Sequence, residues 1–391
     1  MPLVSVTGSR PVVLVLGQAG AVSGGDMHAF RLAEAWHGSG ADVKLIGSPD
    51  LPDFLRRGSR SIAVTLTTPF DRRMSRSGGW LTIGLAARGI KAIRHCRGAS
   101  IVVAGSHLIF DVGTAVAAHL FMRKPVATYV YHVIGDMDRP PTTRTRIANW
   151  LEGLSFRLLK RIGAVVFVDN DDAWVSLVRR GFSPDKLHRT GNAYDPDFSV
   201  PSHAPVFPGR LLFIGRLVEQ KGVWDVIDLG RRLKRAGSSL HIDLVGEGPL
   251  REHLDAVVER EDLQNVHILG LIDEQEKWRL LTTSVLFLAP SREEGWGIAV
   301  GEALLAGVPV IARDLPAYGH FPSHVVRVVQ DGSDFVDAAL ALTEDPREIA
   351  EMTERTRLVH DELPRWEAII SDEIAVLRTL ERSNWSRDDR R

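Results

Sequence analysis

Short apolar runs recur along the whole chain, and stretches with helix-like spacing of apolar residues separate them. The runs are rich in Val and Ile and mostly lack polar alternation. Strands of this kind are buried on both faces, which is typical of a parallel sheet covered by helices. The predicted strands form two series, residues 12–17, 42–47, 61–66, 101–105, 125–133 and 164–169, and residues 210–215, 241–246, 265–270, 285–290, 308–312 and 325–329.

A proline-rich stretch, YDPDFSVPSHAPVFPG, separates the two series, and its prolines exclude a regular helix or a central strand. The 391 residues accommodate two α/β domains of about 150–200 residues each. We therefore predict two Rossmann-like, doubly wound domains that face a central cleft. They span residues 1–195 and 210–365, with a linker at 196–209 and a closing helix and tail at 366–391. Apolar residues repeat at helical spacing over 366–380, and we expect the tail beyond to be frayed.

Two apolar segments could be mistaken for membrane or export signals. The segment PVVLVLGQAGAVSG resembles a signal-peptide core, but Arg10 is its only nearby positive charge and an amphipathic stretch follows, so we interpret it as a buried strand. Residues 101–122 have spanning length, but a central Asp such as Asp111 costs roughly 2.5–3.5 kcal/mol on insertion. We interpret that segment as strand, loop and helix. The single cysteine, Cys96, excludes an internal disulfide and fits a cytoplasmic location.

The net charge is −1, but it is unevenly distributed. Residues 1–200 hold 25 Lys and Arg against 16 Asp and Glu, and the second half is correspondingly acidic. The basic excess concentrates between Arg56 and Arg97, where ten cations accompany one acid, Asp71. Basic clusters attract anionic surfaces, either lipid headgroups or nucleic acid. A solvated positive face explains the cluster, and a peripheral contact with an anionic membrane is the functional alternative; we expect no nucleic-acid partner.

The candidate binding residues follow directly after predicted strands, where doubly wound sheets bind ligands. After the strand RLLFIG comes GRLVEQKG, with Arg216 and Lys221. Two cations beside a helix N-terminus suit a diphosphate, although ordinary surface cations are the alternative. After the strand HIDLVG comes GEGPLRE, in which Gly246 begins a glycine turn. Arg251 replaces the third glycine of a dinucleotide fingerprint, so this turn does not indicate nicotinamide binding.

The stretch SREEGWGIAVGEALLAG follows the strand VLFLAP. Gly295 and Gly297 leave backbone amides accessible to an anion, and the predicted helix that follows points its positive end at the same place. Glu302 lies about one turn inside that helix, and Glu294 lies near the strand end. Carboxylates accept the hydrogen bonds that sugar hydroxyls donate, so one acid can hold a ribose and the other a second sugar. A pair of solvated helix-end acids is the alternative.

In this order and spacing, GRLVEQKG, GEGPLRE and EGWGIAVGE resemble the motifs of the family 4 retaining glycosyltransferases of the GT-B fold, whose donor-site signature is two glutamates separated by seven residues. Three N-terminal segments extend the resemblance: SGGDMHAFRLAEAW to a glycine loop, YVYHV to a histidine-bearing strand end, and GNAYDPDF to an interdomain segment, with Ala193 where glycine is common. The resemblance implies an α/β GT-B fold with an N-terminal acceptor-side domain, a C-terminal nucleotide-sugar-binding domain, and a C-terminal helix that returns toward the N-terminal domain.

The resemblance also implies a role for each matching residue. Arg216 and Lys221 would neutralise the donor diphosphate. Glu302 would hold the ribose hydroxyls, Glu294 the transferred sugar, and His132 would lie near that sugar. His132, Glu294, Arg216 and Lys221 are the catalytic candidates. The remaining donor-binding candidates are Gly24, Gly25, Gly246, Leu271, Gly297 and Ile298.

The activity implied is transfer of a hexose-type sugar from a UDP- or GDP-linked donor to a hydroxyl acceptor, with retention of configuration. No nucleophile for a double displacement is evident in the sequence, so we favour front-face attack. A nucleotide-sugar epimerase and a catalytically silent nucleotide-sugar-binding relative are the alternatives on the same fold. The acceptor class is a sugar, a lipid-linked intermediate or a natural product.

The Asp-Met-Asp at 136–138 mimics the metal-binding motif of another glycosyltransferase fold. No further ligand cluster accompanies it, and the cations at 216 and 221 can supply the positive charge that a metal would otherwise bring. We therefore expect a metal-independent reaction without a cofactor, in the cytoplasm or at the inner face of the membrane.

Overall fold

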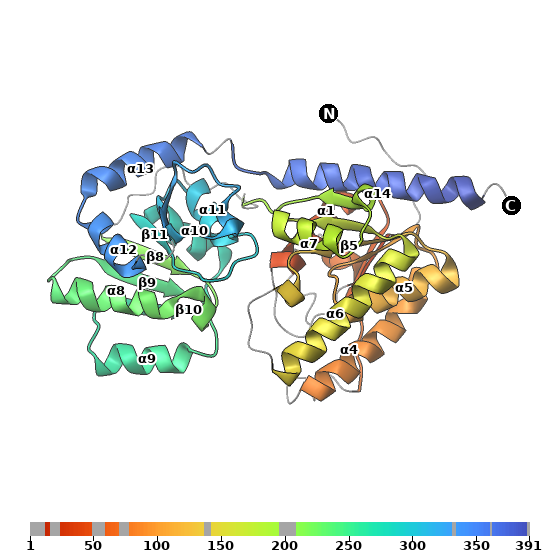
Figure 1. Ribbon diagram of the computed structural model, residues 1–391, viewed down its shortest axis with the longest axis horizontal. Coiled ribbons are helices and arrows are strands. Elements are labelled where there is room, and N and C mark those ends of the chain that lie inside the picture. The colour runs from red at the N-terminus through yellow and green to blue at the C-terminus, as the bar shows by residue number, and fades with distance from the viewer. Residues whose placement is uncertain are drawn as a thin grey trace. The chain divides into compact units, whose positions relative to one another are not determined.

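The two series of predicted strands fold into two separate units, each built on a parallel sheet (Figure 1). The computed structural model describes residues 12–15, 24–48, 59–69, 78–136, 142–194, 209–330, 334–359 and 362–388. Unit 1 comprises Met1–Asn192 with Trp366–Arg391, and unit 2 comprises Ala193–Arg365. The predicted linker at 196–209 lies outside the described residues except for Gly209.

The sheet of unit 1 has the strand order β3-β2-β1-β4-β5-β6-β7, and neighbouring strands run parallel. All six predicted strands of the first series are confirmed. The short edge strand β7 was missed, because its sequence LHR has no apolar run. The strands are β1 (Val12–Val15), β2 (Val43–Gly47), β3 (Ala63–Thr65), β4 (Ile101–Ala104), β5 (Val126–Val130), β6 (Val165–Val168) and β7 (Leu187–Arg189).

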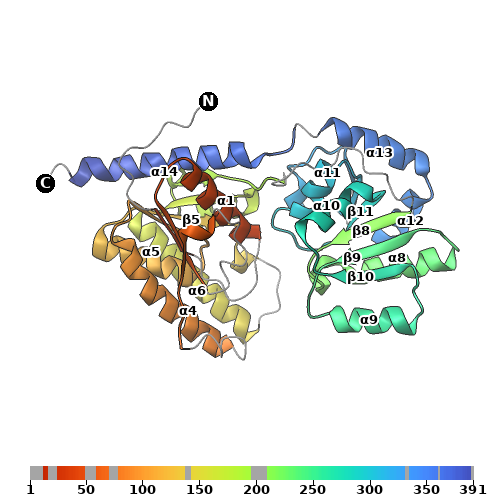
Figure 2. The ribbon, with the colours of Figure 1, turned by 180° about the vertical axis from the view of Figure 1, so that it is seen from behind.

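Helices cover both faces of this sheet, which explains why its strands are apolar throughout. On one face α4, α5 and α6 lie side by side (Figures 1 and 2). On the other face α1 and α14 pack together. The cap of α6 shows why it starts and stops where it does: the Thr142 side chain accepts a hydrogen bond from the Thr145 amide, and Gly163 ends the helix in a left-handed conformation. The helices are α1 (Gly24–Gly38), α4 (Gly78–Ile93), α5 (Ile109–Met122), α6 (Thr143–Ile162), α7 (Asp171–Arg179) and α14 (Trp366–Asp388).

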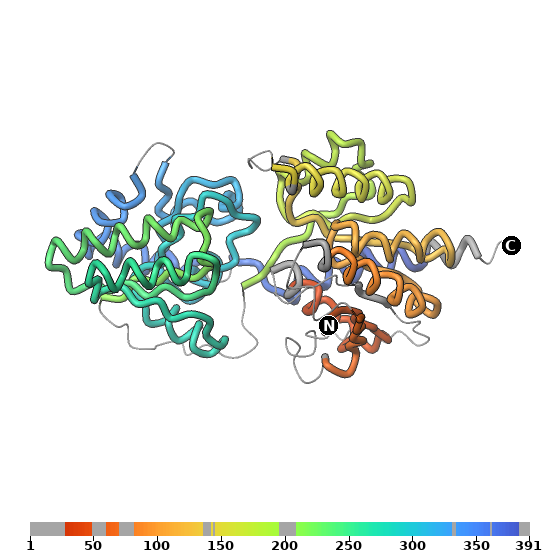
Figure 3. The backbone as a smooth tube through the Cα atoms, turned by 90° about the horizontal axis from the view of Figure 1, so that it is seen from below, coloured from red at the N-terminus to blue at the C-terminus, as the bar shows by residue number. Residues whose placement is uncertain are grey.

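The C-terminal helix α14 belongs to unit 1, as predicted from the resemblance. Its buried residues Ile370, Ile374 and Leu377 repeat at helical spacing and join the core that α1 and the sheet share. The tube in Figure 3 shows this last, blue segment among the elements of unit 1. The prediction of a frayed tail, SNWSRDDRR, was wrong in extent, because the helix continues to Asp388.

The sheet of unit 2 has the strand order β10-β9-β8-β11-β12-β13, again with parallel neighbours, and all six strands of the second series are confirmed. Its strands are β8 (Arg210–Ile214), β9 (His241–Val245), β10 (Val266–Gly270), β11 (Leu286–Ala289), β12 (Val310–Arg313) and β13 (Val326–Val329). Its helices are α8 (Val223–Arg235), α9 (Arg251–Arg260), α10 (Glu274–Thr283), α11 (Ile298–Leu305), α12 (Phe335–Thr343) and α13 (Pro346–Leu358).

The direction of strand order reverses between β1 and β4 in unit 1 and between β8 and β11 in unit 2. In open α/β sheets the connections leave opposite faces at such a switch point, and ligands bind in the crevice beyond the carboxyl ends of the two strands. The loops that follow β1, β4, β8 and β11 are therefore the first places to look for chemistry.

The apolar segment 101–122 resolves into β4, a short loop and α5, as predicted. Among the helices that the structure describes, none combines the length and the apolar character that crossing a bilayer requires.

Candidate active site

In unit 2, the loops after β8 and β11 are locked together at the switch point. The backbone amide of Arg292 donates a hydrogen bond of 2.8 Å to the carbonyl of Gln220. Gly222 packs so closely on Pro290 that a Cβ atom would lie 2.3 Å from the proline carbonyl oxygen, and its φ of 67° is left-handed. Only glycine satisfies both conditions. These backbone contacts hold the two loops next to each other.

The same two loops carry the predicted residues Lys221 and Glu294, which form an ion pair. The Lys221 Nζ atom lies 2.5 Å from Glu294 Oε1, and each side chain is 18% exposed. Ser291 Oγ donates a second hydrogen bond to the same carboxylate oxygen at 3.0 Å. Arg216, on the first loop, is exposed directly after β8. The sequence therefore placed a cation and an acid 73 positions apart at one strand-end site, as the ion pair demonstrates.

The turn before α11 requires glycine at position 297. Gly297 has a φ of 81°, and a Cβ atom there would approach the ring of Tyr318 to 2.7 Å. Gly297 is the residue that caps the start of α11, and Ile298 is its first helical residue. The first amides of a helix lack intrahelical partners, so this end carries unsatisfied donors and positive dipole charge. An anion bound here would receive both.

Glu302 lies one turn inside α11 with its side chain 13% exposed, and its partner is a residue that sequence analysis missed. Lys277 Nζ, on α10, lies 2.6 Å from Glu302 Oε1 and 3.0 Å from an oxygen of Glu274. Burial raises the pKa of Glu302, and the Lys277 ammonium opposes that effect. Burial lowers the pKa of Lys277, but the carboxylates of Glu302 and Glu274 outweigh it, so the pKa is raised. Lys277 is therefore a cation that holds Glu302 in place.

Two further predicted donor residues of unit 2 also follow strands. Gly246, after β9, is buried with a φ of 141°, and a Cβ atom would lie 1.9 Å from the carbonyl oxygen of Gly215. This close packing by itself explains the glycine, and a donor contact at Gly246 stays a prediction. Leu271 follows β10 and is 79% exposed, which leaves its apolar side chain available to a ligand.

The remaining predicted residues, His132, Gly24 and Gly25, belong to unit 1. His132 is exposed two residues after β5, and its ring lies edge-on to that of His107, with centroids 5.8 Å apart. Gly24 and Gly25 are the first residues of α1, and the loop before them lies outside the described residues. Sequence analysis missed His107 and its buried partner Glu152; the position of His107 in the short loop after β4 was the available signal.

In the ranges that the structure describes, no group of three or more His, Cys, Asp and Glu side chains is arranged to hold a metal ion. Asp136 lies within those ranges, and Asp138 of the same motif lies outside them.

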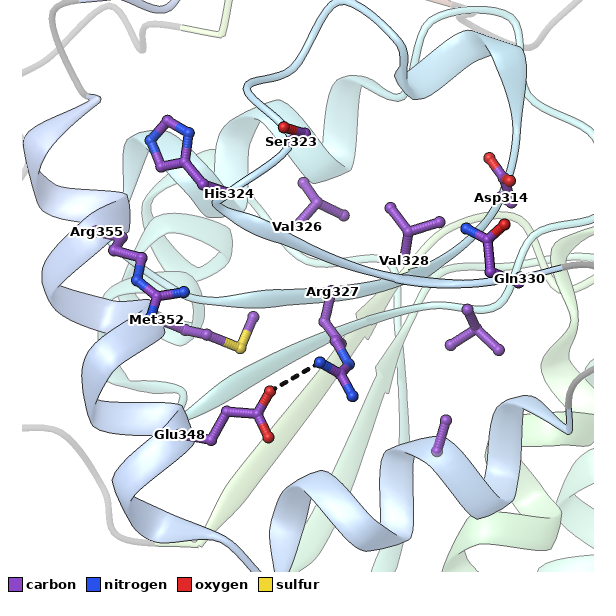
Figure 4. A pocket seen from close by; sticks show the side chains of 12 residues that line it. Asp314, Ser323, His324, Val326, Arg327, Val328, Gln330, Glu348, Met352 and Arg355 are labelled. Atoms are coloured by element: carbon purple, nitrogen blue, oxygen red, sulfur yellow. Dashed lines mark ion pairs between the residues drawn. The ribbon is translucent and has the colours of Figure 1, made fainter.

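A cavity of about 640 Å³ lies beside β13 and α13 of unit 2 (Figure 4). Arg327 and Glu348 form an ion pair of 3.1 Å across it, and Met352 contributes an apolar wall. None of the predicted donor residues lines this cavity, so the strand-end loops and not this hollow are the candidate site.

The chain is similar to known glycosyltransferases. A family model described as "Glycosyltransferase Family 4" matches residues 22–198, and one described as "Glycosyl transferases group 1" matches residues 202–359. The amylovoran biosynthesis glycosyltransferase AmsK of Erwinia amylovora is 29% identical over 147 residues, which is 35% of this chain and 36% of that protein. The glycogen synthase of Mycobacterium tuberculosis is 29% identical over 156 residues, 40% of this chain and 34% of that protein. The matches thus span about a third of the length of these curated relatives.

The crystal structure of HepE from Anabaena in complex with UDP-glucose superposes with a TM-score of 0.72 at 15% identity, and the match covers 95% of this chain and 100% of that chain. This likeness shows the fold. The chain has the GT-B fold, because it forms two Rossmann-like units with parallel sheets and superposes on the HepE structure over nearly its whole length. The chain belongs to glycosyltransferase family 4.

Proposed function

We propose that the protein is a retaining glycosyltransferase that moves a hexose-type sugar from a UDP- or GDP-linked donor to a hydroxyl acceptor without a metal ion. The observation that carries the proposal is the Lys221–Glu294 ion pair at the switch point of unit 2, beside the N-terminus of α11. A cation, an acid and free helix amides at one place suit a sugar diphosphate, which is anionic at one end and rich in hydroxyl donors at the other.

Breaking the sugar–phosphate bond develops negative charge on the leaving diphosphate. Lys221, Arg216 and the first amides of α11 are the groups that would stabilise that charge. Removing one such preorganised donor typically costs about 2.7–4 kcal/mol. Glu294 holds the Lys221 ammonium near the strand end before any donor arrives, so little reorganisation is required. Glu294 would then orient the transferred sugar, and Glu302 would accept hydrogen bonds from the ribose hydroxyls.

We favour front-face attack, in which the acceptor oxygen bonds to the anomeric carbon as the carbon–oxygen bond to the diphosphate breaks, and the leaving phosphate takes the acceptor proton. The HepE structure carries UDP-glucose, which supports a UDP-linked hexose as the first donor to test. His132 would lie near the transferred sugar, and unit 1 would supply the acceptor side.

The test starts from the nucleotide. A thermal-shift panel of UDP, GDP and their hexose conjugates identifies the donor, because a ligand that binds only the folded state raises the melting temperature. Transfer to an acceptor panel is then followed by release of the nucleoside diphosphate, and proton NMR of the product reads its anomeric configuration. Retained configuration with EDTA present supports the proposal. Conversion of the donor to an epimer without acceptor, or binding without any turnover, would contradict it.

We also propose a peripheral contact with an anionic membrane. The contact surface would include the basic cluster at Arg56–Arg97 and the outer faces of α4, α5 and α6. The only acids on these three helices are Asp111 and Glu152, and both are buried. The exposed large apolar residues there are Ile83, Ile90, Leu120, Phe121, Ile147 and Trp150. The exposed cations on or directly after these helices are Lys91, Arg94, Arg97, Arg123, Arg146, Arg157, Lys160 and Arg161. Exposed apolar side chains among cations, without exposed acids, fit the interface of an anionic bilayer.

A further inference from the structure

We propose that Glu152 and His107 are positioning residues that hold the turn carrying His132. The inference rests on the proposed function, in which His132 lies near the transferred sugar, and it assigns a role to two buried residues that no part of the donor site uses. His107 follows β4 at the switch point of unit 1, and His132 follows the neighbouring strand β5. From the middle of α6, Glu152 contacts His107 and the backbone amides two and three residues after His132.

The Glu152 carboxylate is the centre of the arrangement. It is 3% exposed and accepts three hydrogen bonds. Its Oε1 atom accepts from His107 Nε2 at 2.9 Å and from the amide of Ile134 at 2.7 Å, and its Oε2 atom accepts from the amide of Gly135 at 3.0 Å. A buried carboxylate must have its acceptor sites filled to be tolerated. The backbone two and three residues after His132 is therefore fixed to α6.

The charge state of Glu152 agrees with this geometry. Burial raises the pKa of the carboxyl group, but the hydrogen bonds from His107, Ile134 and Gly135 outweigh burial and lower it. Glu152 is thus an anion at neutral pH. A neutral side chain of the same shape, such as glutamine, would present an NH₂ group to one of these donors and could not fill all three contacts.

His107 is held on two sides. Its ring is 1% exposed and stacks on Phe156 of α6, with centroids 5.4 Å apart and an interplanar angle of 16°. Its Nδ1 atom is buried without a hydrogen-bond partner among the described residues. A proton on Nδ1 would be an unsatisfied donor, so the neutral ring carries its proton on Nε2, directed at Glu152. A ring fixed in this way presents a rigid surface to the edge of His132, 5.8 Å away.

This arrangement does more than attach α6 to the sheet. Apolar contacts already do that through Phe156 and Leu159, which are buried in the core beneath α6. The hydrogen bonds of Glu152 instead go to the loop beyond β5 and to the residue beyond β4, the two strand ends that face the acceptor side in the proposed function. Displacing a reacting group by about 1 Å can lower a rate by 10²-fold.

The first experiment compares Glu152→Gln with the unchanged protein. We expect the transfer rate to fall at least tenfold, while the affinity for the free nucleoside diphosphate, for which we propose the Lys221–Glu294 site of unit 2, changes less than twofold. The ring proton resonances of His132, assigned by loss of signal in His132→Asn, should shift. A purely structural role would lower stability without moving that resonance.

Glu373→Gln is the matched control. Glu373 is 1% exposed and also accepts from a histidine, with His28 Nε2 at 2.7 Å, and from the Tyr129 hydroxyl at 2.9 Å. It holds α14 to the same unit without touching the turn after β5. We expect a comparable loss of thermal stability and an unchanged His132 resonance.

Equal effects of the two glutamine variants on the His132 resonance, or no effect of Glu152→Gln on either the resonance or the rate, would overturn the inference. If Glu152→Gln does not fold, His107→Phe replaces it: this variant keeps the stack on Phe156 and removes the Nε2 donor, and the same shift is expected. If the unchanged protein transfers no sugar, the proposed function fails, whereas the His132 resonance still tests the positioning.

Discussion

Lys277 on α10 and Glu302 on α11 form an ion pair of 2.6 Å in which both side chains are at least 85% buried. Breaking a buried pair by removing one partner commonly costs roughly 3–5 kcal/mol, because the remaining charge is uncompensated. The pair also fixes the carboxylate that we propose for the ribose hydroxyls. Its contribution can be separated from that of the diphosphate site with modified nucleotides.

We expect Lys277→Met to weaken UDP binding at least tenfold and to change binding of 2′,3′-dideoxy-UDP less than threefold. The reason is that Glu302 loses the cation that opposes the burial effect on its pKa, becomes protonated more readily, and accepts ribose hydrogen bonds less well. Isothermal titration calorimetry at neutral pH measures both. Glu302→Gln should show the same selectivity; an equal loss for both nucleotides would place the effect outside the ribose contact.

Lys221→Ala and Glu294→Ala should each lower turnover at least tenfold with folding intact, a change of about 1.4 kcal/mol or more in the barrier. The turnover of the double variant should be only slightly below that of the less active single variant, since the two side chains form one ion pair. Steady-state rates of nucleotide release, with circular dichroism as the folding control, test this. Near-normal transfer by either single variant would mean that the donor site is elsewhere.

Gly297→Ala should lower both stability and nucleotide affinity. The left-handed conformation costs an L-residue about 1–2 kcal/mol, and the approach to Tyr318 adds a steric term. Gly307 offers a matched control, because its φ is also left-handed at 78° while the nearest atom to its added Cβ is the Arg357 side chain at 3.6 Å. Urea denaturation should show a larger loss for Gly297→Ala, and only that variant should bind nucleotide more weakly.

The double variant Phe121→Ser and Trp150→Ser should bind vesicles that contain anionic phospholipid at least threefold less than the unchanged protein. These side chains are 81% and 61% exposed, so their removal costs little folding stability while it removes apolar area from the outer helix faces. Vesicle flotation measures the bound fraction. Leu358→Ser, which removes an 80% exposed apolar side chain from unit 2, should bind normally. Equal vesicle binding by the unchanged protein and both variants, or no vesicle binding at low salt, would contradict the proposed membrane contact.

The stability of the unchanged protein should fall as pH drops below the ordinary carboxyl value of 4.5, and Glu152→Gln should remove part of that fall. The sign follows from the lowered pKa of Glu152: the unfolded chain takes up the proton at a higher pH than the folded chain does. The stabilisation is fully present above 4.5 and is lost as pH falls through the lower folded value. Urea unfolding midpoints of both proteins between pH 3 and pH 7 measure this pH dependence of stability. The same pH dependence in the two proteins would contradict the prediction.

The sequence by itself determined the two parallel sheets and indicated two residues that the structure brings together in the candidate site, Lys221 and Glu294. Short continuous apolar runs rich in Val and Ile are typical of strands buried on both faces, and all twelve predicted strands are found. The strand β7 escaped because LHR has no apolar run, and an edge position does not require one. Lys221 and Glu294 were predictable because each lies in the loop that follows a strand, and the strand ends at a switch point lie close together.

Only the tertiary structure decided which buried side chains contact the candidate site residues and hold them in position. Lys277 lies in the middle of an ordinary amphipathic helix, and nothing in its neighbourhood along the chain distinguishes it from a surface cation. It meets Glu302 because α10 packs on α11. Glu152 likewise meets His107 across 45 residues through the packing of α6 on the sheet. Strand ends are fixed by local pattern, whereas the rotation and depth of a helix are set by the whole core against which it packs, so its inward-facing partners emerge only in three dimensions.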